Sequence, residues 1–269
     1  MVLYETHLHT REGSKCGRST GREHARFYAE QGYQGIIVTD HFFGGNVAVD
    51  PSLPWEEQVR LFCYGYEEAK DEGKRLGLDV FFGWESTFEG DDYLVYGLDQ
   101  AWLLAHPEVT SWNRAEQFAQ VHAYGGCVVQ AHPFRERDYL SRILLGDRFS
   151  DAIEAANAGN SPLSDACAWK YAQENHLMVT AGSDNHRSGP ETKLMGIALS
   201  EKLNGIEDYI HLIRKREPIK LLVSSERFVL PEGESLHLPC FLLTEQEEKE
   251  EFHRLWLPEK MDCSPKNGQ

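Results

Sequence analysis

Short apolar runs alternate with longer amphipathic segments along most of this 269-residue chain. Runs rich in β-branched and aromatic residues predict strands at residues 2–10, 35–40, 79–85, 127–131 and 176–182. Weaker runs predict three more, at 151–157, at 196–199 and, as a continuation or hairpin partner of 79–85, at 93–98. Apolar residues at helical spacing predict helices at about 21–31, 55–76, 113–124, 162–174 and 206–216. Strands and helices that alternate in this way are typical of parallel β/α architecture.

The pattern changes from about Ser224. Pro-bearing turns follow, and then the acidic stretch 245–252, which we expect to form a solvated helix. The polar tail after Pro258 predicts disorder. We therefore expect a main domain over residues 1–223 and an acidic, partly disordered C-terminal extension over residues 224–269.

The composition narrows the classes of function. A formal net charge of −16 opposes binding to extended nucleic acid, because an acidic surface repels a phosphate backbone. A small anionic substrate stays open, because bound divalent cations reverse the local field. There is no run of about 18 apolar residues and no basic-then-apolar leader, so we expect no membrane contact and a cytoplasmic location. The 6 cysteines are scattered without a Cys-x-x-Cys pair, as expected for reduced thiols.

Side chains that bind metals recur where the predicted strands end. His7 and His9 flank Leu8, so a strand would place both imidazoles on one face. The later strand ends supply further His, Asp and Glu residues, namely Asp40, His41, Glu85, His132, Asp184 and His186. The carboxyl ends of strands meet at one rim of a β/α barrel, so these residues predict a metal site there. Imidazoles combined with carboxylates suit Zn, Mn or Fe better than Mg or Ca.

In this order the motifs resemble the polymerase-and-histidinol-phosphatase (PHP) family. The resemblance is carried by His7-x-His9, Thr39-Asp40-His41, Gly83-Trp84-Glu85, Ala131-His132-Pro133 and Ser183-Asp184-x-His186. It covers roughly residues 1–223 and implies an α/β fold, a distorted (β/α)7 barrel with its metal site at the carboxyl ends of the strands. It also implies two or three divalent metal ions (Zn, Mn or Fe), with phosphoester hydrolysis as the commonest activity.

The resemblance assigns ligands to two of these ions. His7, His9, Glu85 and Asp184 match the ligands of the first ion. Glu85 would bridge to a second ion that also takes His132. Among these residues we expect Glu85, His132 and Asp184 to be essential for catalysis.

Two positions depart from the family pattern. Asp92 stands where the family often has a histidine, and we expect its carboxylate to complete the second site. His41 and His186 match ligands of a third ion, but the loop after the first strand lacks the usual His or Asp. Cys16 is a candidate thiolate ligand there. The alternative is a weaker or absent third site.

Two arginines follow predicted ligands closely. Arg135 comes just after His132-Pro133-Phe134, and Arg187 comes directly after His186. A guanidinium fork matches the geometry of a phosphate, so we expect both to contact substrate and Arg135 to assist catalysis. The alternative is a pair of ordinary surface arginines.

The sequence therefore predicts a metal-dependent phosphoesterase, either a phosphatase or a phosphodiesterase. It would hydrolyse a small phosphorylated metabolite with a metal-activated water, in the manner of histidinol phosphatase. One alternative is hydrolysis of another bond, such as an amide, on the same metals. The other is a non-catalytic binding module stabilised by metal. The oligomeric state is left open.

Overall fold

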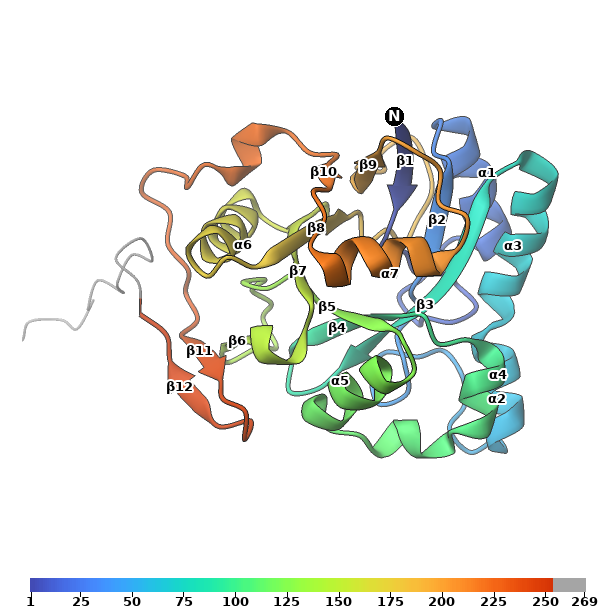
Figure 1. The fold of residues 1–269 in the computed structure, drawn as a ribbon, viewed down its shortest axis with the longest axis horizontal. Helices are drawn as coiled ribbons and strands as arrows, with labels where there is room; N and C mark the ends of the chain where they lie inside the picture. Colours follow the sequence, from blue (N-terminus) through green and yellow to red (C-terminus); the bar gives the residue numbers. More distant parts are fainter. Residues whose placement is uncertain (254–269) are drawn as a thin grey trace, which may run out of the picture.

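The computed structural model describes residues 1–253, in which a nine-stranded sheet curls toward a barrel and helices cover its outside (Figure 1). The strands of this sheet are β1 (Val2–Glu5), β2 (Gly35–Val38), β3 (Asp79–Thr87), β4 (Asp92–Tyr96), β5 (Cys127–Ala131), β7 (Ala152–Asn157), β8 (Met178–Gly182), β9 (Ile197–Leu199) and β10 (Lys220–Leu221). The helices are α1 (Gly21–Glu30), α2 (Trp55–Phe62), α3 (Tyr64–Leu76), α4 (Gln100–Ala105), α5 (Arg114–Ala123), α6 (Pro162–Glu174) and α7 (Ile206–Lys215). The α1 and α3 helices pack side by side at one end of the molecule (Figure 1).

The sheet runs in the order β10-β9-β1-β2-β3-β4-β5-β7-β8. The β1-β2-β3 and β5-β7-β8 groups are parallel, whereas β4 is antiparallel to β3 and β5, and β9 is antiparallel to β1. The predicted strand at 93–98 is thus the hairpin partner of β3. A parallel bridge between Leu8 and Asn185 links the segments beyond β1 and β8, so the sheet nearly closes. The predicted α/β barrel is confirmed, with two antiparallel strands within it.

The first strand is shorter than predicted and ends at Glu5. Beyond it, the backbone N–H of His7 donates to the Glu5 carboxylate and that of Leu8 donates to Thr39 Oγ1. Side chains therefore take the donors that a continued strand would give to its neighbours. His7 and His9 lie in this short extended segment, just past the end of β1.

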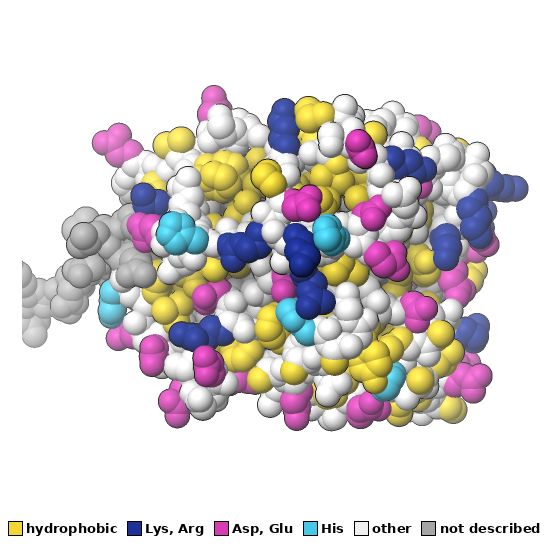
Figure 2. Space-filling model, viewed as in Figure 1, with side chains coloured by type: hydrophobic (Ala, Val, Ile, Leu, Met, Phe, Trp, Pro, Cys, Tyr) yellow, Lys and Arg dark blue, Asp and Glu magenta, His cyan; other side chains and the backbone are white. Residues whose placement is uncertain are grey.

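Helix α7 covers the amino ends of several strands. Its buried residues Tyr209, Ile210 and Ile213 pack in one apolar cluster with the first residues of β5, β7 and β8. This packing leaves the opposite, polar rim of the barrel open. On the face that carries α7, acidic side chains are dispersed and several Lys and Arg side chains lie near the centre (Figure 2). No helix in the described part of the chain has the length and apolar character needed to cross a membrane.

The single helix predicted over 55–76 is wrong, because Cys63 divides it into α2 and α3. The two halves pack on different neighbours, α2 on α4 and α3 on α1. Phe62 ends α2 inside a cluster of aromatic rings that includes Phe42 and Phe82. A local pattern cannot show that two adjacent helical turns face different partners.

The C-terminal extension packs on the barrel through a second sheet. Strand β11 (Cys240–Leu243) pairs in parallel with β6 (Ile143–Leu145) and antiparallel with β12 (Lys249–Glu251). The solvated helix predicted over 245–252 is wrong, because pairing with β11 decides the conformation of this charged stretch. The predicted domain boundary near Ser224 stays a prediction, and the tail after Pro258 lies outside the described residues.

A buried ion pair also fastens the extension. Arg227 donates from Nε to Asp165 Oδ2 at 2.7 Å and from Nη2 to the carbonyl oxygens of Asn157 and Asn160. The Asp165 side chain is fully buried, and its pKa is raised by burial. Without Arg227 this carboxylate would keep hydrogen bonds from Asn160 and from the Asn157 backbone, but no cation.

We predict that Arg227→Ala lowers the free energy of unfolding by about 3 kcal/mol, because removing one partner leaves a buried charge uncompensated. Arg148→Ala is the matched control, since its ion pair with Glu245 is exposed and worth about 0–1 kcal/mol. Urea unfolding of both variants measures the difference. Equal midpoints would show that the Arg227 contact does not hold the extension in place.

Candidate metal centre

Four side chains converge at the open rim of the barrel. His7 Nε2 lies 3.1 Å from His9 Nε2, 3.4 Å from Glu85 Oε1 and 3.6 Å from Asp184 Oδ1. His9 Nε2 lies 3.4 Å from Glu85 Oε2 and 3.1 Å from Asp184 Oδ1. These four residues, which we call the four-donor cage, come from the segments after β1 and β8 and from β3. The sequence-predicted ligands of the first ion are thus brought together.

The spacing of the four-donor cage fits a metal ion. Bonds of about 2.0–2.1 Å to a tetrahedral zinc place the ligand atoms roughly 3.3 Å apart. The observed distances of 3.1–3.6 Å bracket that value. The Nε2 atoms of His7 and His9 also face each other at 3.1 Å, with no carboxylate oxygen between them. Two nitrogen lone pairs directed at one cation would give this arrangement. The residues present therefore fit a divalent metal.

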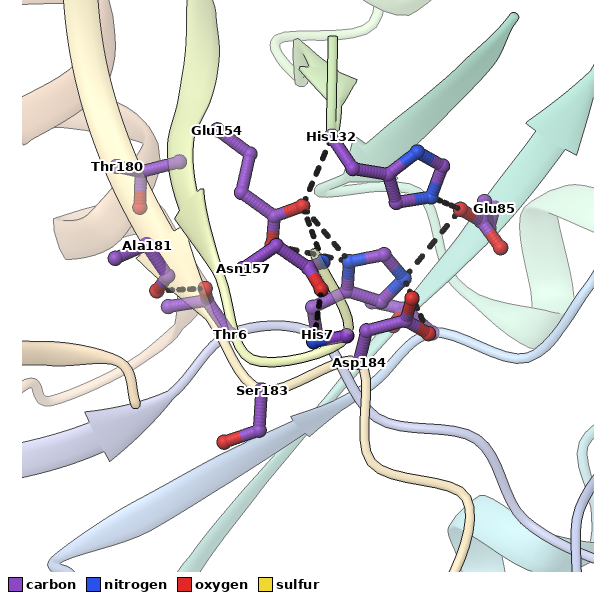
Figure 3. Close-up of polar contacts among 12 residues, drawn as sticks. Thr6, His7, Glu85, His132, Glu154, Asn157, Thr180, Ala181, Ser183 and Asp184 are labelled. Atoms are coloured by element: carbon purple, nitrogen blue, oxygen red, sulfur yellow. Dashed lines mark hydrogen bonds and ion pairs between the residues drawn. The ribbon is translucent and has the colours of Figure 1, made fainter. Parts of the chain in front are cut away.

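The carboxylate of Glu154 orients the ring of His7. Its oxygens lie 3.0 and 3.3 Å from His7 Nδ1, on the side of the ring opposite Glu85 and Asp184 (Figure 3). An ionised carboxylate only accepts hydrogen bonds, so Nδ1 carries the proton and Nε2 presents its lone pair to the cage. Glu154 also accepts from the backbone N–H of His132 and from Asn157 Nδ2.

A chain of hydrogen bonds through Ser14 and Asp40 orients the ring of His9. Ser14 Oγ donates to Asp40 Oδ1 at 2.7 Å, so the 3.2 Å contact between Ser14 Oγ and His9 Nδ1 takes its proton from the ring. Asp40 also accepts from the backbone and hydroxyl of Thr10, which closes the loop after β1. Burial raises the pKa of Asp40 to about 7 despite these donors. Asp40 therefore positions His9 through Ser14, although it directly precedes His41.

Glu85 links the four-donor cage to two further imidazoles. Its Oε1 lies 3.0 Å from His132 Nε2 and its Oε2 lies 2.8 Å from His41 Nδ1. Burial acts to raise the pKa of Glu85, but the charges of His41 and His7 and the hydrogen bond with His132 hold it well below its usual range. The predicted bridging position of Glu85 between two sites agrees with this geometry.

Asp92 lies farther from the predicted second site than its other members. Its Oδ2 is 3.9 Å from His132 Nε2, whereas Glu85 Oε1 is 3.0 Å from the same nitrogen. Burial and the charge of Glu85 raise the pKa of Asp92 to about 6. Asp92 lines the same pocket, so its role as a ligand stays a prediction.

A third group of donors joins His9 to the predicted ligands of the third ion. Donor atoms of His9, His41 and His186 lie within 4.8 Å of one another. The thiol of Cys16 lies beside His41 and His186 in the pocket. Burial acts to raise the pKa of Cys16, but these two imidazoles outweigh it and lower the pKa to about 6.

Two of the predicted ligands have strained backbones. His132 has φ 31° and Asp184 has φ 52°, in the left-handed region that residues other than glycine rarely adopt. Such positions cost about 1–3 kcal/mol each and persist where the surroundings fix them. The backbone of His132 is fixed by its hydrogen bond to Glu154, and the side chain of Asp184 by Arg135.

The side chain of Arg135 points toward Asp184 and two asparagines. It donates from Nη1 to Asp184 Oδ2 at 2.6 Å, from Nε to Asn160 Oδ1 and from Nη2 to Asn157 Oδ1. Its side chain is 11 % exposed and lines the pocket, with three of its nitrogens engaged by protein oxygens. Arg135 therefore holds the second oxygen of Asp184, and its contact with substrate stays a prediction.

Other arginines border the pocket above the metal-binding residues. This cavity of about 270 Å³ is lined by Cys16, His41, Glu85, Asp92, His132, Asp184 and His186, together with Arg137, Tyr139 and Arg142. Arg187 is exposed and is not among the lining residues, so its predicted contact with substrate stays untested. The sequence interpretation missed Arg137 and Arg142, because neither adjoins a ligand.

The sequence interpretation also missed Glu154 and Glu5. Glu5 is fully buried and accepts from the backbone N–H groups of His7 and Ser183, which ties the segment after β1 to the loop after β8. Each is a lone acid in an apolar strand, and such an acid must find partners when it is buried. That signal was present in the sequence.

Three solved structures share the fold. A protein from Bifidobacterium adolescentis assigned as a metal-dependent phosphoesterase aligns over 78% of this chain and 96% of its own, with 18% identity and a TM-score of 0.51. A two-domain protein from Bacteroides vulgatus that contains a predicted PHP-like metal-dependent phosphoesterase aligns over 79% of this chain and 63% of its own, with 15% identity and a TM-score of 0.58. An amidohydrolase from Chromobacterium violaceum, with bound sulfate and no metal, aligns over 84% and 100%, with 16% identity and a TM-score of 0.51.

These similarities are structural. No protein-family model matches the sequence, and no curated protein matches it significantly. At 15–18% identity the three structures establish a shared fold, and they confirm the predicted PHP-type barrel.

We predict that Glu154→Gln weakens metal binding by about 10–100-fold. If the glutamine oxygen accepts from His7, its amide faces the donors of His132 and Asn157. If it is flipped, the amide donates to His7 Nδ1 and drives the ring proton to the metal-facing nitrogen. Titration calorimetry with zinc measures the change, with the exposed Glu30→Gln as a matched control. Unchanged affinity in Glu154→Gln would refute this role.

Metal removal is expected to destabilise the fold. An ion that binds only the folded cage contributes about 2.7 kcal/mol at 100 times its Kd. In a domain of this size that raises Tm by about 5–10 °C. Melting curves with zinc and with chelator test this, and Glu85→Gln should show a much smaller difference. Identical curves for the wild type would mean that the cage binds no ion.

Proposed function

We propose that this chain, which has the fold of PHP-like phosphoesterases, is a metal-dependent hydrolase of small phosphorylated metabolites. The observation that carries the proposal is the four-donor cage, in which Glu85 is shared with His132 and His41. Adjacent groups of His and carboxylate donors are suited to hold more than one ion. Two or three divalent ions, of Zn, Mn or Fe, match this donor set.

The rim of the pocket favours an anionic substrate. Arg137 and Arg142 line it from the loop after β5. Arg142 lies 3.4 Å from Glu89, and both partners are about half exposed, so this pairing is weak. A guanidinium released from it can bind a phosphate oxygen, whereas a neutral amide offers no matching charge. This cationic rim favours a phosphoester over an amide.

The size of the pocket favours a small substrate. Its volume of about 270 Å³ suits a metabolite, and the net charge of −16 opposes an extended nucleic acid. Histidinol phosphate was the expected substrate type by resemblance, but the comparisons give it no support. The proposal therefore names a class of substrate, and a phosphatase and a phosphodiesterase remain equally compatible with it.

Different residues of the chain would orient the metal ligands and bind the phosphate. When bound, the ions lower the pKa of a water molecule and stabilise charge on the phosphoryl oxygens. Glu154 and Ser14 keep the proton of each cage imidazole away from the ions, and Arg135 fixes the second oxygen of Asp184. Arg137 and Arg142 orient the phosphate at the mouth of the pocket.

We predict that Glu85→Gln lowers the rate of phosphate release roughly 10³-fold or more. The substitution removes a charge shared by adjacent sites, and each ~1.4 kcal/mol of lost stabilisation is a tenfold loss of rate. Metal-loaded wild type and variant are compared on a panel of phosphomonoesters and phosphodiesters. Metal content is measured on the same samples.

Glu30→Gln again serves as control and should match the wild type. A wild type that is inert on every phosphoester but cleaves small amides would replace this proposal with amide hydrolysis. A metal-loaded wild type inert on both panels would favour a non-catalytic binding module.

A further inference from the structure

The loop that carries Cys16 is fastened to the segments that carry His41 and His186. The backbone N–H of Lys15 donates to Asn46 O at 2.9 Å, and that of Arg18 donates to His186 O at 2.7 Å. Residues Ser14 and Val47 form an isolated antiparallel bridge. These contacts hold the thiol in place between two loops that are far apart in sequence.

Gly17 lets this loop lie close to the segment after β1. A Cβ on Gly17 would lie 2.2 Å from the carbonyl oxygen of Thr10, so no other residue fits without a shift of the backbone. Ser14 Oγ also accepts from the backbone N–H of His41. Cys16 is therefore positioned by the fold itself.

The thiol of Cys16 lies beside two imidazoles in the pocket. These are the rings of His41 and His186, and all three side chains line the pocket. His186 Nδ1 lies 2.8 Å from the carbonyl oxygen of Asp184, to which it donates, so in the neutral ring Nε2 carries the lone pair. His9 brings a third imidazole to within 4.8 Å of the other two.

An unsatisfied carboxylate oxygen points independently to a cation here. Glu85 is 1% exposed, and its Oε2 lies 2.8 Å from His41 Nδ1. Among the described residues, neither atom has a hydrogen-bond partner of acceptable geometry. Buried polar atoms seldom stay without partners, and a cation between them would satisfy both.

Cys16 differs from the other described cysteines. Cys63, Cys127, Cys167 and Cys240 are buried and belong to apolar clusters. Cys16 alone among them is partly exposed and lies among imidazoles. A packing role explains the first four and does not explain Cys16.

We propose that Cys16 is a thiolate ligand of an ion also held by His41 and His186, and that this position selects zinc. Thiolate and imidazole donors favour zinc, whereas Mn and Mg prefer oxygen. The inference rests on the metal binding of the proposed function but not on the bond that is cleaved. The centre would then combine positions with imidazole and carboxylate donors with one sulfur-bearing position.

The test uses cobalt in place of zinc in the full chain. Cobalt bound to a thiolate gives an intense near-ultraviolet charge-transfer band that imidazole and carboxylate ligands do not give. We expect this band in the wild type and its loss in Cys16→Ser and Cys16→Asp. Zinc content, measured by mass spectrometry, should fall by about one equivalent per chain in Cys16→Ser. Cys16→Asp should restore most of that equivalent without restoring the band.

Each outcome decides the point. A band that persists in Cys16→Asp assigns the sulfur ligand to another cysteine and overturns the proposal. Absence of the band in fully loaded wild type also overturns it. Circular dichroism melting confirms that each variant is folded. Neither readout depends on turnover, so the proposal can fail while phosphoester hydrolysis stands, or hold while hydrolysis fails.

Discussion

The carboxylate of Glu85 is buried among four imidazoles, those of His7, His9, His41 and His132, and the candidate metal centre is built around it. A charge taken out of water is tolerated only with compensating partners, and the three carboxylates of Glu85, Asp184 and Glu154 cannot neutralise four rings if all four are cationic. The arrangement is therefore most favourable when the rings are neutral and metal ions supply the positive charge. Glu154 and Ser14 act toward the same state, because each accepts a hydrogen bond from the Nδ1–H of one ring and so leaves Nε2 of the neutral ring without a proton.

Much of the barrel follows from local pattern, because each strand and helix has a periodicity that its own residues carry. The convergence of the candidate ligands could be predicted for a related reason. His132 and Asp184 stand directly after apolar runs, and parallel strands deliver such residues to one rim whatever the details of packing. The elements that local pattern predicted wrongly take their conformation from partners distant in sequence. Charged residues 249–251 form a strand because Cys240–Leu243 lies beside them, and Cys63 breaks a helix whose halves pack on different neighbours.

The residues that support the ligands were harder to predict. Glu5 and Glu154 sit inside apolar strands, where a single acid barely changes the pattern, yet each organises several backbone and side-chain donors. Arg135 shows the opposite case. Its position after His132 predicted a contact with substrate. In the folded chain its side chain donates to Asp184 and two asparagines. Sequence position indicated its neighbourhood but not the direction of its side chain.

Strand β1 lies in the interior of the sheet, between β2 and β9. During synthesis, His7 and His9, just past the end of β1, leave the ribosome well before Asp184 and β9. At about 5–20 residues per second this delay is of the order of ten seconds or more. Until then the four-donor cage lacks the carboxylate of Asp184. The four-donor cage can therefore form only after the segment beyond β8 has been synthesised and has docked beside His7 and His9.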